Sequence, residues 1–497
     1  MLLEVIIALL LTSCTTSHMA AEPLLTGSWQ RSIASLQSAP AEPLPLPTRI
    51  PQEPLHLSLR EAILLALRTS PDVQTAELQR VVDKFTLVVA HNAYEPQYTL
   101  GGTANFAQGT APSYAMGPGV SLLSSIGTQA ALSYNNAFAG DTGQTTFTIT
   151  QPLLKGFGWA YNTANWFNAL DAEAVAKLSF QNSIQQAVLA VLTRYRTLIQ
   201  DDQNIKVTQQ AVDLAEKALT RSHTLLTTGK MAHSDFVQQQ ANLASTRLML
   251  VQAHNMREQD YQSLLQALGL TADATIILND TMTPTALKPL PLSHCIQAAL
   301  LHNTTYQAAQ FNLREKRRAL MMAKNQAQWE LNLTASTSVG ASTGSAIVPA
   351  GTPNTVVADG VGPSAGVTLN IPLNDVQAKQ AVVNARVALE QAEVAFQALH
   401  DNLIRTITRE VQQINNGLAQ IHIAHQTVRL EQDALNAERL KLHYGKSTVF
   451  EVNQLQTEWL SAATQAISTE INVLNDISSL DNDMGTLLDK WQVKLRA

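Results

Sequence analysis

Charged side chains are scarce in this chain of 497 residues, at 14% against about a quarter in average globular proteins. Aromatic residues make up only 5%, and the formal net charge is −6. A basic surface of the kind that binds nucleic acid is therefore excluded. The two cysteines, Cys14 and Cys295, are too few for a disulfide framework, and we expect Cys295 to be a small buried residue.

Long apolar runs are also missing. The run at residues 5–12 is too short to span a bilayer and is typical of the end of a signal peptide. No helix predicted here could cross a membrane, so any crossing would need a closed barrel of strands.

What the chain does have is one long helical pattern, present twice. In each copy, apolar residues recur every seven positions, which is the heptad spacing of helices that pack lengthwise on one another. The two columns are separated by 216 positions and consist of Leu198, Ile205, Val212, Leu219 and Leu226, and of Ile414, Ile421, Val428, Leu435 and Leu442. Each copy ends at a glycine-lysine pair, Gly229-Lys230 or Gly445-Lys446. We predict long helices over 156–228 and 374–444, with return helices over 231–268 and 447–484.

Two segments almost free of charge precede these helices. Residues 94–152 contain two charged residues, as do residues 329–372, and both segments alternate in the period-2 manner of strands. Each closes with a proline, Pro152 or Pro372, which fits a strand that gives way to a helix. Residues 94–167 hold 12 of the 26 aromatic residues. Such a cluster is expected either for a girdle at a membrane interface or for a hydrophobic plug between helices.

Specific residues connect this pattern to a known family. Residues 57–67 read Leu-x-Leu-x-x-Ala-Ile-x-x-Ala-Leu and are followed by Ser-Pro-Asp. Together with the 151–158 segment Gln-Pro-Leu-Leu-Lys-Gly-Phe-Gly and with Ile371-Pro372-Leu373, they make the chain similar to the TolC-like outer-membrane efflux proteins over residues 57–488. Within that family, the lipoprotein branch of the outer membrane factors fits best.

The fold class we predict is mainly α with a β-barrel contribution. A helix-strand-strand-helix unit is duplicated, long coiled-coil helices form a periplasmic tube, and four strands per chain join a transmembrane barrel. Four strands cannot close alone, since the smallest membrane barrels have about eight. The resemblance implies a homotrimer with twelve strands, in which a further strand-like run at 127–134 is either an outside hairpin or a continuation of the second strand.

The domains that we predict follow from these segments. They are a signal peptide with a lipobox-like end (1–14), a proline-rich linker (15–56), a first repeat (57–280, strands about 97–152), a second repeat (281–488, strands about 329–372) and a tail (489–497). Leu11 to Cys14 resemble a bacterial lipobox, whose cysteine is lipidated. The alternative is an incidental Cys14 in a plain signal peptide.

The resemblance implies a function and its partners. It predicts a passive, non-enzymatic exit duct without cofactor or metal, located in the outer membrane and extending into the periplasm. An inner-membrane pump would drive it through a periplasmic adaptor that contacts the tips at Gly229, Lys230, Gly445 and Lys446. Ordinary left-handed glycines that end a helix would look the same there. A periplasmic coiled-coil scaffold without a pore is the alternative function.

Asp235 and Glu451 lie six residues after the two tip glycines. The resemblance makes Glu451 part of a carboxylate ring at a periplasmic gate and makes Asp235 a contact that holds the gate closed. The family's second acid is replaced by Gln454. The other interpretation is that both acids favour a helix N-terminus electrostatically.

Two weaker motifs carry no function. Gly445-Lys446-Ser447-Thr448 lacks the first glycine and the strand of a phosphate loop. His422 and His425 lack a third ligand at metal spacing.

Overall fold

The computed structural model describes residues 55–106, 113–137, 143–280, 289–340 and 362–493. These residues belong to one compact unit that starts at Leu55. The predicted signal peptide and nearly all of the predicted linker, Cys14 included, lie outside the described residues, as do residues 494–497 of the predicted tail. The helices predicted to be longest are α6 (Ala164–Thr227) and α10 (Val376–His443), which at ~1.5 Å per residue are each roughly 100 Å long.

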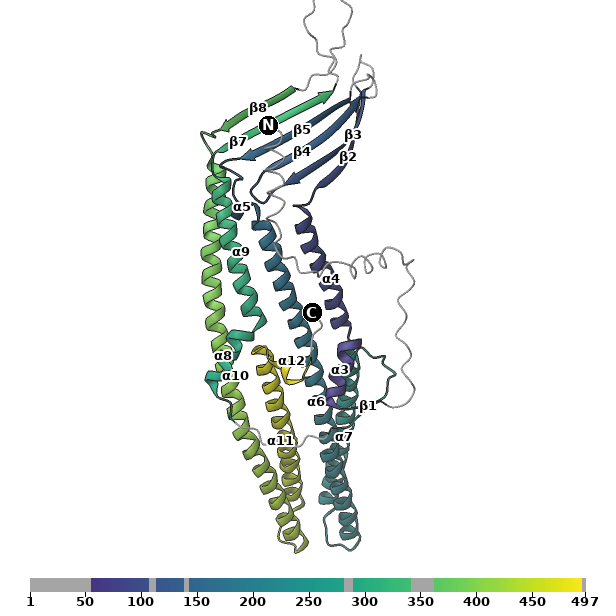
Figure 1. The fold of residues 1–497 in the computed structure, drawn as a ribbon. Helices are drawn as coiled ribbons and strands as arrows, with labels where there is room; N and C mark the ends of the chain where they lie inside the picture. Colours follow the sequence, from purple (N-terminus) through teal and green to yellow (C-terminus); the bar gives the residue numbers. More distant parts are fainter. Residues whose placement is uncertain (1–54, 107–112, 138–142, 281–288, 341–361, 494–497) are drawn as a thin grey trace, which may run out of the picture. The chain divides into compact units, whose positions relative to one another are not determined.

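The other main helices are shorter and stack in pairs beside the long ones (Figure 1). Near the sheet, α4 (Pro71–Asn92) and α9 (Thr304–Gln326) flank α6. Towards the end far from the sheet, α7 (His233–Leu268) and α11 (Val449–Asp483) flank α6 instead. The lateral order is therefore α4, α6, α9, α10 in one half and α7, α6, α11, α10 in the other. Among the described helices, α4, α7 and α10 therefore each have one lateral side without a long helix beside it.

The heptad columns are buried in the helix seams at some positions and only partly buried at others. Leu435, Ile414 and Leu198 are fully buried, and Val212 nearly so. Leu435 forms a cluster with Ala211, Val452 and Trp459, which joins α10 and α11 to α6. Leu219 is only partly buried and packs against the cluster of Val212, Ala215 and Leu243.

Helix ends follow the local sequence. Ser58 and Glu61 form a reciprocal capping box at the start of α3 (Leu59–Thr69), and Pro71 opens α4 at its first position. Pro at that position removes an N–H that would have no helical partner. In the second repeat, α8 (Leu292–His302) and α9 meet at Asn303, whose side chain accepts a hydrogen bond from the Tyr306 amide.

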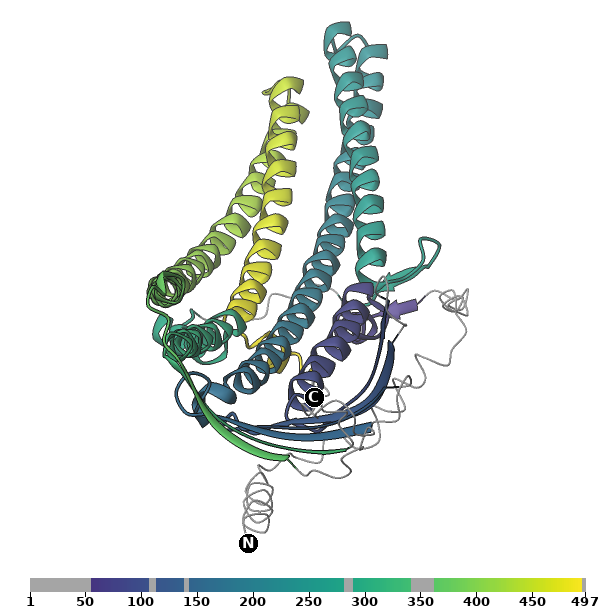
Figure 2. The same cartoon turned by 90° about the horizontal axis from the view of Figure 1, so that it is seen from above.

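The sheet differs from the prediction. Over the described residues it has six strands rather than four, in the order β2-β3-β4-β5-β7-β8, and all neighbours are antiparallel. Their bounds are β2 (Gln97–Asn105), β3 (Ser113–Leu123), β4 (Gln129–Ala137), β5 (Gly143–Pro152), β7 (Glu330–Gly340) and β8 (Gly362–Asn370). Figure 2 shows that this sheet is curved.

A tight reversal explains the extra strands. The Ser124 amide donates to the Thr128 carbonyl, and the Gly127 amide donates to the Ser124 carbonyl. Gly127 has φ +96°, and a Cβ at this residue would lie 2.5 Å from the Gly156 carbonyl oxygen. Glycine is needed at this turn, so β4 enters the sheet as a strand of its own between β3 and β5. Both sequence interpretations of the 127–134 run were wrong.

A small parallel pair, β1 (Leu55–Leu57) and β6 (Ile276–Leu278), ties the start of the described chain to the end of the first repeat. The predicted linker bound at 56 therefore extends into a strand by two residues. Beside this pair, α3, α6, α7 and α12 (Leu487–Lys490) contribute to the largest hydrophobic cluster of the described residues. Cys295 is buried in the corresponding cluster of the second repeat, as predicted.

Candidate functional site

The two tip turns, Gly229-Lys230 and Gly445-Lys446, have the same geometry. Gly229 has φ +69° and Gly445 φ +72°. The Lys230 amide donates to the Leu225 carbonyl at 2.8 Å, and the Lys446 amide donates to the Lys441 carbonyl at 2.9 Å. These bonds satisfy carbonyls that a helix end leaves open. Both lysines are exposed, so the turns close the long helices and present a cation at each tip.

Asp235 and Glu451 occupy the same third position of their return helices, but their surroundings differ. Thr448 caps α11, and the Glu451 carboxylate accepts hydrogen bonds from the Thr448 amide and the Ser447 hydroxyl. These bonds hold the pKa of Glu451 below its usual value. In α7 the capping position is Ala232, whose side chain cannot form such a bond. Glu451 is therefore an ionised, exposed carboxylate held in a capping box, whereas Asp235 lacks one.

A polar link that the sequence analysis missed joins the two return helices. The side-chain amides of Gln239 and Asn242, both on α7, donate to the Asn453 side-chain oxygen of α11 at 3.2 Å each. Gln239 is buried. It corresponds to Leu455 in the other repeat, and this polar-for-apolar difference between the copies was the available signal. Gln454, where the resemblance implied a second acid, donates to Glu458 instead.

The two faces of the sheet have different chemistry. One face gathers large, strongly exposed apolar side chains of the described strands: Tyr98, Leu100, Tyr114, Met116, Leu122, Leu132, Tyr134, Leu333, Val339, Val367 and Leu369. Leu100 pairs with Pro118 and Leu333 with Val367 on this face. The opposite face carries Thr, Ser, Asn, Gln and Gly with few exceptions, such as Leu123 and Ala131.

The strand-helix junctions contain the prolines singled out from the sequence. Pro152 is the last residue of β5, and Pro372 follows β8 by two residues. After Pro152 the Leu153 amide still donates to the Leu331 carbonyl at 2.8 Å. Aromatic residues gather here, for example Trp159, whose ring packs edge-on against Phe167. Trp159 is half exposed.

Partway along the long helices, hydrogen bonds join the first repeat to the second. Arg196 of α6 is buried and donates through one guanidinium nitrogen to the Leu474 carbonyl at 2.7 Å and to the Ser478 hydroxyl at 2.8 Å. Burial lowers the pKa of Arg196 to about 10. Because these bonds satisfy a desolvated cation, loss of either α11 acceptor would be costly.

Each repeat also holds a pair of close carboxylates between its long helix and its return helix. Burial, with Asp260 nearby, raises the pKa of Asp201 to about 7. Burial, with Asp483 nearby, raises the pKa of Glu410 to about 7. One oxygen of Asp201 and one of Glu410 are buried without a hydrogen-bond partner. Two acids so close favour sharing one proton.

Within the described ranges, no group of three or more His, Cys, Asp or Glu side chains is arranged to hold a metal ion. His425 lies 3.9 Å from Glu470, and its neighbour His422 is exposed. In the same ranges, none of the helices is both long and apolar enough to cross a membrane.

Comparison with known proteins decides the family. The family model described as outer membrane efflux protein matches residues 63–270 and 295–486, which together are most of the chain. The chain belongs to the outer membrane efflux protein family. No curated protein matches it. The two matched segments coincide with the two repeats, so the duplication seen in the heptad columns is the family's own repeat.

Solved structures have the same fold as this efflux protein. The outer membrane protein VceC from Vibrio cholerae is similar, with a TM-score of 0.66 and 16% identity over 86% of this chain and 96% of its own. The CmeC outer membrane channel of Campylobacter jejuni has a TM-score of 0.63 and 14% identity, covering 86% of each chain. The open-state MtrE channel of Neisseria gonorrhoeae has a TM-score of 0.61 and 15% identity, covering 86% and 89%.

The family assignment confirms the prediction of a non-enzymatic outer-membrane efflux channel and decides against the pore-free scaffold. The mainly helical, duplicated fold class is also confirmed.

Proposed function

We propose that three copies of this efflux protein close into one exit duct of a tripartite efflux or type I secretion system. An inner-membrane pump would supply the substrate through a periplasmic adaptor. The observation that carries the proposal is the two-faced sheet. An apolar face without charge suits lipid, and an opposite face of hydroxyls and amides suits a water-filled passage.

The edges of the sheet support closure by further copies. Strands β2 and β8 each have one unpaired edge within the described sheet. The number of strands is even, so β8 would run antiparallel to β2 of the next copy, as all described neighbours do. Three copies would contribute eighteen strands, rather than the twelve that the resemblance implies.

The free sides of the helices support the same closure. On α4, Arg80 and His91 turn towards α6, and an exposed apolar stripe lies on the opposite side: Leu78, Val82, Phe85 and Val89. On α10, Tyr306 of α9 stacks on Phe396, and the exposed stripe away from α9 is Val376, Val383, Val387 and Val394. Stripes of this spacing fit helix-helix seams, here between α10 of one copy and α4 of the next.

Light scattering of the detergent-solubilised protein tests the trimer. Val82→Asp and Val387→Asp should each shift trimers towards monomers, because each buries a carboxylate in a seam. Leu64→Asp is the matched control, since Leu64 is equally apolar and exposed but lies on α3. Monomeric wild-type protein, or variants that all remain trimeric, would contradict the proposal.

For the gate, we propose that three Glu451 carboxylates form one ring at the narrow end and attract cations. In planar bilayers, Glu451→Gln should reduce cation selectivity and blockade by multivalent cations while trimers persist. Asp235→Ala should raise conductance if Asp235 holds the closed state. Because Glu451 also belongs to a capping box, Thr448→Val is the control: it weakens the cap but keeps the charge, and should leave selectivity intact. Unchanged selectivity in Glu451→Gln would leave only the capping role.

The exposed tips are the proposed adaptor contact. Single cysteines at Lys230 or Lys446 should crosslink to a cognate adaptor, and a cysteine at Gln200 on mid-α6 should not. Crosslinking that does not depend on position would contradict the assignment.

We also propose that Cys14 is lipidated, which would place the chain in the lipoprotein branch of the family. Cys14→Ser should then lose labelling by a radioactive fatty acid, and retained label would refute the anchor.

A further inference from the structure

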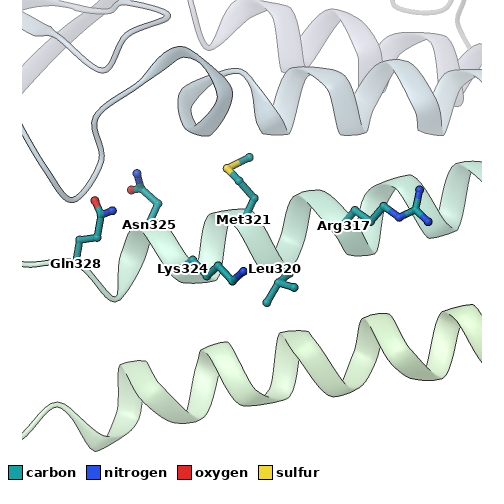
Figure 3. Close-up of a pocket in the computed structure, with 6 residues that line it drawn as sticks. All are labelled: Arg317, Leu320, Met321, Lys324, Asn325 and Gln328. Carbon is teal, nitrogen blue, oxygen red and sulfur yellow. The ribbon is translucent and has the colours of Figure 1, made fainter.

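An open hollow on α9 lies where the helices meet the sheet. Its volume is about 380 Å³, and its lining consists of Arg317, Leu320, Met321, Lys324, Asn325 and Gln328. Figure 3 shows Met321 and Asn325 on one edge of α9, and Leu320 and Lys324 on the edge nearer to α10. Apolar groups and cationic groups thus share one small surface. We call it the α9 hollow.

The hollow borders the end of the apolar sheet face. Side chains alternate along β7, so Trp329 continues the face of Leu331 and Leu333. The Lys155 amide donates to the Trp329 carbonyl at 3.1 Å, which extends the β5–β7 ladder to this residue. Trp329 is 55% exposed, and Leu373, after β8, is 98% exposed. The apolar face therefore ends in an aromatic and aliphatic rim immediately beside Gln328 of the hollow.

Two exposed lysines lie near the helix ends that adjoin the sheet, Lys324 at the end of α9 and Lys379 at the start of α10. Lys324 lies two residues before the end of α9 at Gln326 and five residues before Trp329. Lys379 of α10 is exposed and follows Val376 by three residues. Within the described part of the chain, neither lysine forms an ion pair, whereas Arg317 reaches Glu393 of α10 at 3.6 Å. The lining of the hollow thus includes one lysine, Lys324, that has no ion pair among the described residues.

An apolar face, followed by an aromatic rim and then by lysines, is an order that fits one class of ligand. An aromatic rim marks the level where apolar chains meet headgroups, and lysines extend from apolar surroundings to bind at the polar level. We propose that the α9 hollow binds the headgroup of an anionic membrane phospholipid. Its phosphate lies at Lys324, with Lys379 as the second cation, and its first methylenes cover Leu320 and Met321.

The inference rests on the proposed placement of the apolar sheet face in lipid. Binding is measured by calorimetry on the detergent-solubilised full chain. The probes are short-chain phosphatidylglycerol, phosphatidylcholine of the same chain length, and inorganic phosphate. We expect phosphatidylglycerol to bind more tightly than phosphatidylcholine. Lys324→Gln should weaken it about fivefold, the effect of one lysine near an anionic surface. Lys379→Gln should act in the same direction.

Lys217→Gln is the matched control. Lys217 is an exposed lysine of α6 in the half far from the sheet, without an ion pair among the described residues, so its removal should leave binding unchanged. Inorganic phosphate that binds as tightly as the lipid would reassign the hollow to free anions and overturn the proposal. Equal effects of Lys217→Gln and Lys324→Gln would do the same.

Channel recordings separate this inference from the proposed function. Lys324→Gln should still form channels of wild-type ion selectivity. If the wild type conducts but does not discriminate between the two lipids, the lipid site is wrong and the duct stands. If headgroup binding is lost in Lys324→Gln while the wild type never conducts, the duct is wrong. A change of ion selectivity in Lys324→Gln would place the hollow on the conduction path instead.

Discussion

Four glycines end helices in the same left-handed conformation, yet we expect their replacement by alanine to lower the unfolding free energy by two different amounts. Gly229 and Gly445 lie at the tips, where an added Cβ would meet nothing within 4 Å. Gly269 and Gly485 lie at mid-height, and a Cβ there would lie 2.1 Å from the Thr69 carbonyl oxygen and 2.2 Å from that of His302. The mid-height glycines are related by the repeat, so the chain offers two independent pairs for the same comparison.

The magnitudes follow from these contacts. Alanine in the left-handed region costs about 1–2 kcal/mol at any of the four positions. At Gly269 and Gly485 the obstacle is backbone, which cannot swing aside as the end of a side chain does. Overpacking adds roughly 1–3 kcal/mol there. Gly269→Ala should therefore lose about 2–5 kcal/mol of unfolding free energy. Gly229→Ala should lose only about 1–2 kcal/mol, which comes from the left-handed backbone.

The assay is denaturant unfolding in detergent, followed by circular dichroism of the helices, on the four single alanine variants. We expect both mid-height variants to be less stable than both tip variants. If the tip variant and the mid-height variant of each repeat lose the same unfolding free energy, the reasoning is refuted, because the close approach to the carbonyl would then contribute nothing. A tip variant that is less stable than its mid-height partner would refute it as well.

Three further outcomes are expected. Leu435→Ala should lose about 2–5 kcal/mol, since Leu435 is fully buried, whereas Leu440→Ala at an exposed site should change stability by about 0.5 kcal/mol or less; denaturant unfolding compares the two. The folded chain favours protonated Asp201, whose pKa rises from 3.8 to about 7, so it holds more protons than the unfolded chain and its stability falls as pH rises through that window. Asp201→Asn should flatten this decline in a pH series of unfolding curves, and an unchanged slope would contradict the assignment. Deleting residues 113–137 should leave four strands and a narrower passage, because diameter grows with strand number; exclusion of neutral polymers from the sheet side measures it, and an unchanged cut-off would contradict the six-stranded wall.

The sequence alone was sufficient for the helical part of the molecule. Heptad columns extend over tens of residues, so their period is unambiguous. A glycine with positive φ follows each of α6, α7, α10 and α11, because glycine adopts this conformation with the least strain. The predicted return helix 447–484 compares with the observed Val449–Asp483. Repetition helped, because Gly229 and Gly445 support each other's interpretation.

The sheet and the contacts between repeats were decided by tertiary structure. Alternation over residues 94–152 predicts strands, but it does not say where a strand reverses. The reversal at Gly127 depends on its closeness to Gly156, which is 29 positions away. The link from Asn453 to Gln239 and the carbonyl contacts of the mid-height glycines likewise join positions far apart in the chain. Local periodicity determines which residues share a face, whereas the partner of that face exists only once the helices are packed.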